Sequence, residues 1–278
     1  MAGFQNILYA GLAGCLLGLV SGQVYAADAS PWAEDNYAAA RLIAGSAQGD
    51  GKVLRAGIEI RMRPGWHTYW RYPGDSGIPP RFDFTGSTNL ASAEVLFPAP
   101  HLLTDETGNS IGYAGDVVFP LRVTPREPGK PVSLRLKFAY AVCEKLCVPE
   151  EGHMTLDLTG AASGNDARLA KAEARVPKPV TVESLSLSVR RVHDGPKPQV
   201  TVDFKAADGK PVQVFAEGPT PEWALPVPQP AQTASANKRR FQFALDGLPP
   251  GTDPKGPVAL TLTVVEGANA YEVKTRLD

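Results

Sequence analysis

The chain has 278 residues, of which 43% are hydrophobic and 21% are charged, and its formal net charge is −1. This composition is typical of a globular chain that buries a core. The balanced charge and the scattered basic residues exclude the electrostatic footprint of a protein that binds nucleic acid or an anionic membrane. After residue 26, no segment reaches the roughly 18 apolar residues that a membrane span needs.

The N-terminus predicts export. Residues 1–26 contain an apolar run from Ile7 to Val20 and end in Val24-Tyr25-Ala26, a small-x-small cleavage pattern, so we interpret them as a secretory signal peptide. An alternative is a lipoprotein with Cys15 acylated, but the apolar Leu-Leu-Gly-Leu-Val that follows Cys15 favours the signal peptide. Either interpretation places the protein outside the cytoplasm, and we expect the periplasm.

The next residues alternate between apolar and polar side chains, as half-buried antiparallel strands do. The alternation is clear in residues 52–63, 132–142 and 153–158, and a Pro/Gly-rich turn separates 119–123 from 132–142. We predict an immunoglobulin-like β-sandwich over 27–162.

The C-terminal part repeats this pattern. Six short alternating runs follow one another, at 185–189, 200–204, 212–214, 241–245, 258–264 and 271–273. Such a density of strands predicts a second, smaller β-sandwich over 179–278, so the fold class is all-β. We expect a helical linker at 163–178 that stops at Pro177, and a solvated Pro-rich loop at 218–232.

Cys143 and Cys147 are separated by three residues at the end of a predicted strand. A disulfide between them would close a very small loop and would remove little entropy from the unfolded chain, so a structural staple has a weak rationale. A short surface disulfide suits thiol–disulfide exchange. The charged side chains of Glu144 and Lys145 keep the turn at the surface. Lys145 favours a lower pKa of a neighbouring thiol and Glu144 a higher one, so the sequence does not identify which cysteine attacks.

A metal site is the alternative chemistry for the same residues. Cys143 and Cys147 with His153 have the soft thiolate and imidazole ligands that suit Cu(I), and His67 and His101 are further candidates. The surrounding strands count against the thioredoxin-like fold in which such copper sites occur, and a zinc site would lack ligands. We therefore predict no cofactor and no metal, with copper binding or copper tolerance as the alternative.

Three segments carry a family resemblance: "GWHTYWRYPGDSGIPPRFDF" (65–84), "GYAGDVVFPLRV" (112–123) and "LKFAYAVCEKLCVPEEG" (136–152). Together they resemble the N-terminal periplasmic domain of the thiol:disulfide interchange protein DsbD, in its ScsB-like, copper-sensitivity-suppressor branch. The likeness covers about residues 30–160. It implies an immunoglobulin-like fold whose cysteine pair takes electrons from a membrane-embedded transporter and passes them to periplasmic thioredoxin-like proteins.

The resemblance also implies residue roles. Cys143 and Cys147 match the redox pair, Tyr140 matches the aromatic residue before it, and Tyr69 and Trp70 match the aromatic strand near the disulfide. Asp105, Glu106 and Thr107 stand where the family has a cap loop with an aromatic shield. A shield would therefore have to come from elsewhere, with Tyr113 and Trp66 as candidates.

The sequence thus predicts a periplasmic thiol–disulfide exchange protein of the protein-disulfide reductase type. The family's transmembrane and thioredoxin-like domains do not follow in these 278 residues, so we expect the membrane electron donor to be a separate chain. A non-catalytic sandwich that binds another protein is a further alternative.

Overall fold

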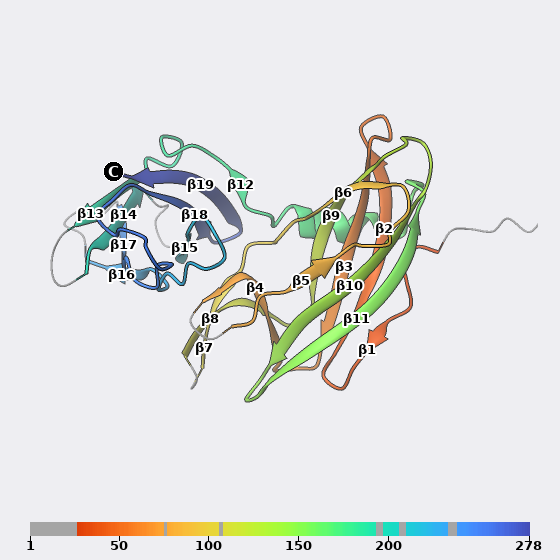
Figure 1. The fold of residues 1–278 in the computed structure, drawn as a ribbon, viewed down its shortest axis with the longest axis horizontal. Coiled ribbons are helices and arrows are strands. Elements are labelled where there is room, and N and C mark those ends of the chain that lie inside the picture. The colour runs from red at the N-terminus through yellow and green to blue at the C-terminus, as the bar shows by residue number, and fades with distance from the viewer. Residues whose placement is uncertain (1–26, 75–76, 106–107, 193–196, 206–209, 233–237) are drawn as a thin grey trace, which may run out of the picture.

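The computed structural model describes residues 27–278 apart from 75–76, 106–107, 193–196, 206–209 and 233–237. The predicted signal peptide, Cys15 included, lies outside the described residues. Two β-sandwiches lie side by side, and a segment with a short helix connects them (Figure 1).

The first sandwich consists of two sheets and contains the cysteine pair. One sheet has the order β1-β2-β3-β9-β6, and the other has the order β11-β10-β4-β8-β7 with β5 paired to β10. The strands are β1 (Ala33–Glu34), β2 (Ala38–Gln48), β3 (Val53–Met62), β4 (His67–Gly74), β5 (Arg81–Asp83), β6 (Leu90–Val95), β7 (His101–Asp105), β8 (Gly108–Ala114), β9 (Val117–Pro125), β10 (Val132–Cys143) and β11 (Cys147–Leu158).

The second sandwich has two four-stranded sheets, with the orders β12-β19-β18-β15 and β13-β14-β17-β16. Its strands are β12 (Lys178–Pro179), β13 (Ser188–Val192), β14 (Gln199–Lys205), β15 (Val212–Glu217), β16 (Gln229–Ala231), β17 (Lys238–Ala244), β18 (Val258–Glu266) and β19 (Asn269–Leu277). The predicted run at 185–189 is displaced, because Ser186 has a φ of 47° and the extended backbone begins only at Ser188.

Alternation explains the packing of the long strands. Along β10 the even-numbered residues from Val132 to Val142 are buried, and β11 pairs with β10 in a continuous antiparallel register. Most of the buried apolar residues of both sandwiches form one connected cluster. The prediction of an all-β chain with an immunoglobulin-like sandwich followed by a smaller one is confirmed.

The helix α1 (Asp166–Glu173) lies within the predicted linker, but it packs on the first sandwich. Leu169 is fully buried against Gly57, where a Cβ atom would lie 2.7 Å from Leu169 Cδ2. The Arg55 guanidinium binds Asp166 at 3.0 Å and Glu173 at 2.8 Å, one carboxylate at each end of the helix. The helix is therefore part of the sandwich rather than a free connection.

The expectation of a solvated loop at 218–232 is wrong. Trp223, Leu225 and Val227 are buried, and the Tyr72 hydroxyl of the first sandwich donates a 2.6 Å hydrogen bond to the Leu225 carbonyl. The segment is Pro-rich, but its alternate apolar side chains enter the shared core. None of the helices in the described part of the chain is long and apolar enough to cross a membrane.

Replacing Leu169 by Ala should lower the free energy of unfolding by about 2–5 kcal/mol, because the side chain fills a notch that cannot collapse fully. Urea unfolding followed by circular dichroism would measure the loss. Lys171→Ala, on the exposed side of the same helix, is the matched control and should change stability by less than about 0.5 kcal/mol. Equal effects in the two variants would contradict the packing role of the helix.

Candidate functional site

Cys143 and Cys147 form a disulfide at the end of the β10–β11 hairpin. The two residues are the last register pair of the hairpin, and their Cα atoms lie 4.2 Å apart. Glu144, Lys145 and Leu146 form the turn between them, and all three are exposed. The register of two long strands therefore fixes the bridge, and a three-residue turn presents it at the surface.

The two cysteines have different exposure. Cys143 is 5% exposed, whereas Cys147 is classed as exposed. Next to Cys147, the Leu146 side chain is 73% exposed, which is unusual for a large apolar residue. Because an attacking thiolate must reach the sulfur in line with the bond, the exposed Cys147 is the accessible side of this disulfide.

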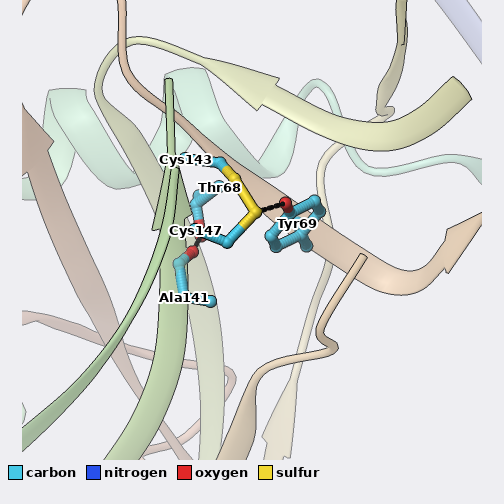
Figure 2. The surroundings of a disulfide bond; sticks show 5 residues. All are labelled: Thr68, Tyr69, Ala141, Cys143 and Cys147. Atoms are coloured by element: carbon cyan, nitrogen blue, oxygen red, sulfur yellow. Dashed lines mark hydrogen bonds between the residues drawn. A yellow bond between two sulfur atoms is a disulfide. The ribbon is translucent and has the colours of Figure 1, made fainter. Parts of the chain in front are cut away.

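Tyr69 lies behind the disulfide. Its hydroxyl is 3.1 Å from Cys147 Sγ, and since a disulfide sulfur carries no hydrogen, the hydroxyl donates (Figure 2). Tyr69, Ala141 and Cys143 form a small buried cluster separate from the main core. The Thr68 hydroxyl donates a 2.8 Å hydrogen bond to the Ala141 carbonyl and holds β4 against β10 at this point.

Tyr140 and Trp70, expected near the disulfide, belong to the main core instead. Alternation along β10 turns Tyr140 inward, where it stacks on Phe138 with ring centroids 4.5 Å apart. Burial, followed by the nearby charge of Glu150, raises the pKa of the Tyr140 hydroxyl. Trp70 packs against Phe215 of the second sandwich at 5.9 Å.

The two candidates for an aromatic shield contact other parts of the domain. Tyr113 is buried and donates to the Pro98 carbonyl, and Trp66 stacks on Tyr37. The aromatic residue whose hydroxyl contacts Cys147 Sγ is Tyr69, and Gly77 packs so closely on its ring that a Cβ atom would lie 2.7 Å from Tyr69 Cδ1.

The predicted cap loop is only partly described. Asp105 is the last residue of β7 and its backbone pairs with Gly108, while Glu106 and Thr107 lie outside the described residues. The role of these three residues stays a prediction.

The alternative ligand His153 does not join the cysteines. It pairs with Lys137 six residues along β11 from Cys147, a separation of about 20 Å at the rise of a strand, and it contacts Glu151. The histidine beside the disulfide is His67, which pairs with Cys143 and packs edge-on against Tyr69. Among the described residues no three metal-ligating side chains gather into a group.

Glu150 is a feature that the sequence argument missed. It is 5% exposed and faces inward from β11, next to Asp35. Burial, together with the hydrogen bond and charge of Asp35, raises the pKa of Glu150 to about 7, and the same hydrogen bond lowers the pKa of Asp35. Extending the alternation of Met154, Leu156 and Leu158 backwards along the strand would have placed Glu150 on the buried face.

Comparisons with known proteins show which class of protein this chain resembles. Residues 37–159 match the family model described as "Thiol:disulfide interchange protein DsbD, N-terminal". The matched residues lie within the first sandwich, which is therefore similar to the DsbD N-terminal domain. No curated protein sequence matches the chain.

One solved structure supports the fold. The chain is similar to the N-terminal periplasmic domain of ScsB from Proteus mirabilis, with a TM-score of 0.69 and 19% identity over 90% of this chain and 98% of that one. At 19% identity the similarity shows a shared fold only. Because the match covers 90% of this chain, the shared fold includes both sandwiches. A marsupial T cell receptor chain also matches at 13% identity over 87% of this chain and 97% of that one, but its TM-score of 0.21 is too low to indicate a shared fold.

Glu150 makes the stability of the fold depend on pH. Its folded pKa of about 7 lies above the ordinary 4.5, so between these values the folded chain keeps a proton that the unfolded chain releases. Stability should therefore fall as the pH rises through this window, by on the order of 1 kcal/mol, because solvent screens part of the effect. Urea unfolding at about pH 5 and about pH 8 would measure the change.

The Glu150→Gln variant is the matched test, since it keeps the shape of the side chain and removes the titration. The free energy of unfolding of this variant, compared with that of the native protein, should be higher at about pH 8 than at about pH 5. A constant difference between the two proteins would contradict the role of Glu150.

Proposed function

We propose that the Cys143–Cys147 pair is the redox-active disulfide of a periplasmic electron relay. The observation that carries this proposal is the asymmetry of the bridge, with Cys147 exposed and Cys143 buried at 5% exposure, within a sandwich similar to the DsbD N-terminal domain. A structural staple gains nothing from an exposed cysteine at the tip of a hairpin, whereas exchange requires a bridge that a partner thiol can reach.

Reduction begins at Cys147. A thiolate of the membrane donor attacks Cys147 Sγ, a donor–Cys147 disulfide forms, and Cys143 leaves as a thiolate that takes up a proton. The second donor thiolate then attacks the donor sulfur of this mixed disulfide and releases Cys147. The donor has become a disulfide and the pair a dithiol, so two electrons have been transferred.

The reduced pair then reduces a thioredoxin-like client in the periplasm. The Cys147 thiolate attacks the client disulfide, and Cys143 resolves the mixed disulfide by attacking Cys147 and releasing the client dithiol. Tyr69 supports both steps, because a hydroxyl donor stabilises a thiolate more than a neutral sulfur. The exposed Leu146 supplies apolar contact area for either partner beside the reacting sulfur.

We place residues 1–26 as the export signal and 179–278 as a second domain. The ScsB structure that this chain resembles is periplasmic, which supports the same compartment here. For Asp105, Glu106 and Thr107 the family resemblance is the support for a cap-loop role. His153 lies away from the sulfurs, so the copper alternative is left with the cysteines and without that histidine.

Single cysteine variants test the order of attack. Cys143→Ser should trap a mixed disulfide with an oxidised thioredoxin-like protein, because Cys147 attacks and no resolving thiol follows. Cys147→Ser should form its adduct at least about tenfold more slowly, because the remaining thiol is buried. Mass spectrometry of timed, acid-quenched samples measures both rates.

The double Cys→Ser variant is the control and should keep the fold while forming no adduct. Equal rates for the two single variants would contradict the assignment of Cys147. A reduction potential of the native pair well below about −300 mV, the range of resistant structural bridges, would contradict the relay itself.

A further inference from the structure

The pairing of strand β4 with β8 becomes irregular directly after Tyr69, the residue that contacts the disulfide. Its register with β8 runs from His67 to Tyr69, which pairs with Gly112, and resumes only at Gly74, which pairs with Ser110. No β8 pairing is recorded for the intervening residues 70–73, all of which are described. The end of β4 that follows Tyr69 therefore needs other contacts to hold it.

The second sandwich supplies a charged contact in this gap. The Arg71 guanidinium binds Glu217 at 2.8 Å through Nη2 and 2.9 Å through Nε, and the same Nη2 binds Glu272 at 2.6 Å. The two carboxylates come from β15 and β19, which flank β18. Burial disfavours the charged guanidinium, but the hydrogen bonds and charges of both carboxylates outweigh this effect and raise the pKa of Arg71.

Trp70 and Tyr72, which flank Arg71 in β4, also contact the second sandwich. Trp70 is fully buried and its ring lies 5.9 Å from that of Phe215, which shares β15 with Glu217. The Tyr72 hydroxyl donates to the Leu225 carbonyl at 2.6 Å. Three consecutive residues of β4 are thus held by the second sandwich, immediately after the residue that is held by the disulfide.

We propose that the second sandwich braces β4 and that Arg71 is a positioning residue for the redox pair. By fixing the backbone from residue 70 to residue 72, the brace keeps the Tyr69 hydroxyl within hydrogen-bond distance of Cys147 Sγ. The inference deepens the proposed function and rests on it for its biological meaning. In chemical terms, contacts with the second sandwich influence the equilibrium constant between the Cys143–Cys147 disulfide and its dithiol.

The direction of the effect follows from the hydrogen bond. On reduction Cys147 gains negative charge, and a correctly placed hydroxyl stabilises that charge more than it stabilises the disulfide sulfur. Among the described residues, the Tyr69 hydroxyl contacts the sulfur, the His67 ring packs against Tyr69, and Glu144 and Lys145 lie in the adjoining turn. Of these, only Tyr69 adjoins the braced residues directly.

The test compares the native protein with Tyr69→Phe, Arg71→Gln and the double variant. Each is equilibrated with glutathione buffers above the ordinary thiol pKa of about 8.5, so that the reduced pair carries a thiolate. Acid quenching and alkylation give the fraction reduced. Tyr69→Phe should shift the equilibrium constant about tenfold towards the disulfide, which corresponds to about 30 mV for a two-electron couple.

Arg71→Gln should shift the constant in the same direction by about threefold to tenfold, and it should add nothing in the Tyr69→Phe background, because both variants remove one interaction. Arg55→Gln is the matched control. Arg55 also binds two carboxylates, Asp166 and Glu173, but it lies in β3, which belongs to the other sheet of the first sandwich. It should lower the stability while leaving the constant within about twofold of the native value.

The proposal is overturned if Arg71→Gln leaves the constant within about twofold, or if its effect adds in full to that of Tyr69→Phe. Should Arg71→Gln fail to unfold cooperatively, Glu272→Gln, which removes one of the two carboxylates, takes its place with the same expectations. The glutathione equilibrium needs no physiological partner. A native protein that never exchanges with a thioredoxin-like protein would therefore contradict the relay without deciding the brace.

Discussion

Strand β4 lies between the disulfide hairpin and the second sandwich, and its consecutive side chains contact one or the other. Tyr69 donates to Cys147, and Arg71 is clamped by Glu217 and Glu272. The two contacts are thus only two residues apart on one strand. They lie where the pairing of β4 with β8 is irregular.

The disulfide depends on this arrangement for its asymmetry. The hairpin register alone would bring Cys143 and Cys147 together, but it would not bury one of them. Cys143 is covered because Tyr69 and Ala141 pack on the same outer face of the sheet. The turn of Glu144, Lys145 and Leu146 keeps Cys147 at the surface. Exchange at one sulfur with resolution by the other is the chemistry that such an asymmetry favours.

Much of the fold was predictable because strand periodicity is local. The alternation in 132–142 and 153–158 identified both arms of the cysteine hairpin, and the family resemblance pointed to the matched residues 37–159. The solvated loop at 218–232 was predicted wrongly, because Pro-rich composition hides alternate Trp223, Leu225 and Val227, which enter the core. Trp70 was placed near the disulfide because an aromatic cluster in sequence does not reveal which face each ring occupies.

The sequence by itself determined the all-β class, the hairpin and the cysteine pair, since each depends on residues close together along the chain. The tertiary structure decided which cysteine is accessible, which aromatic residue contacts it and what holds that residue in place. Those features depend on contacts between residues up to 201 positions apart, as Arg71 and Glu272 are. No periodicity encodes such pairs, because they exist only where the two sandwiches meet.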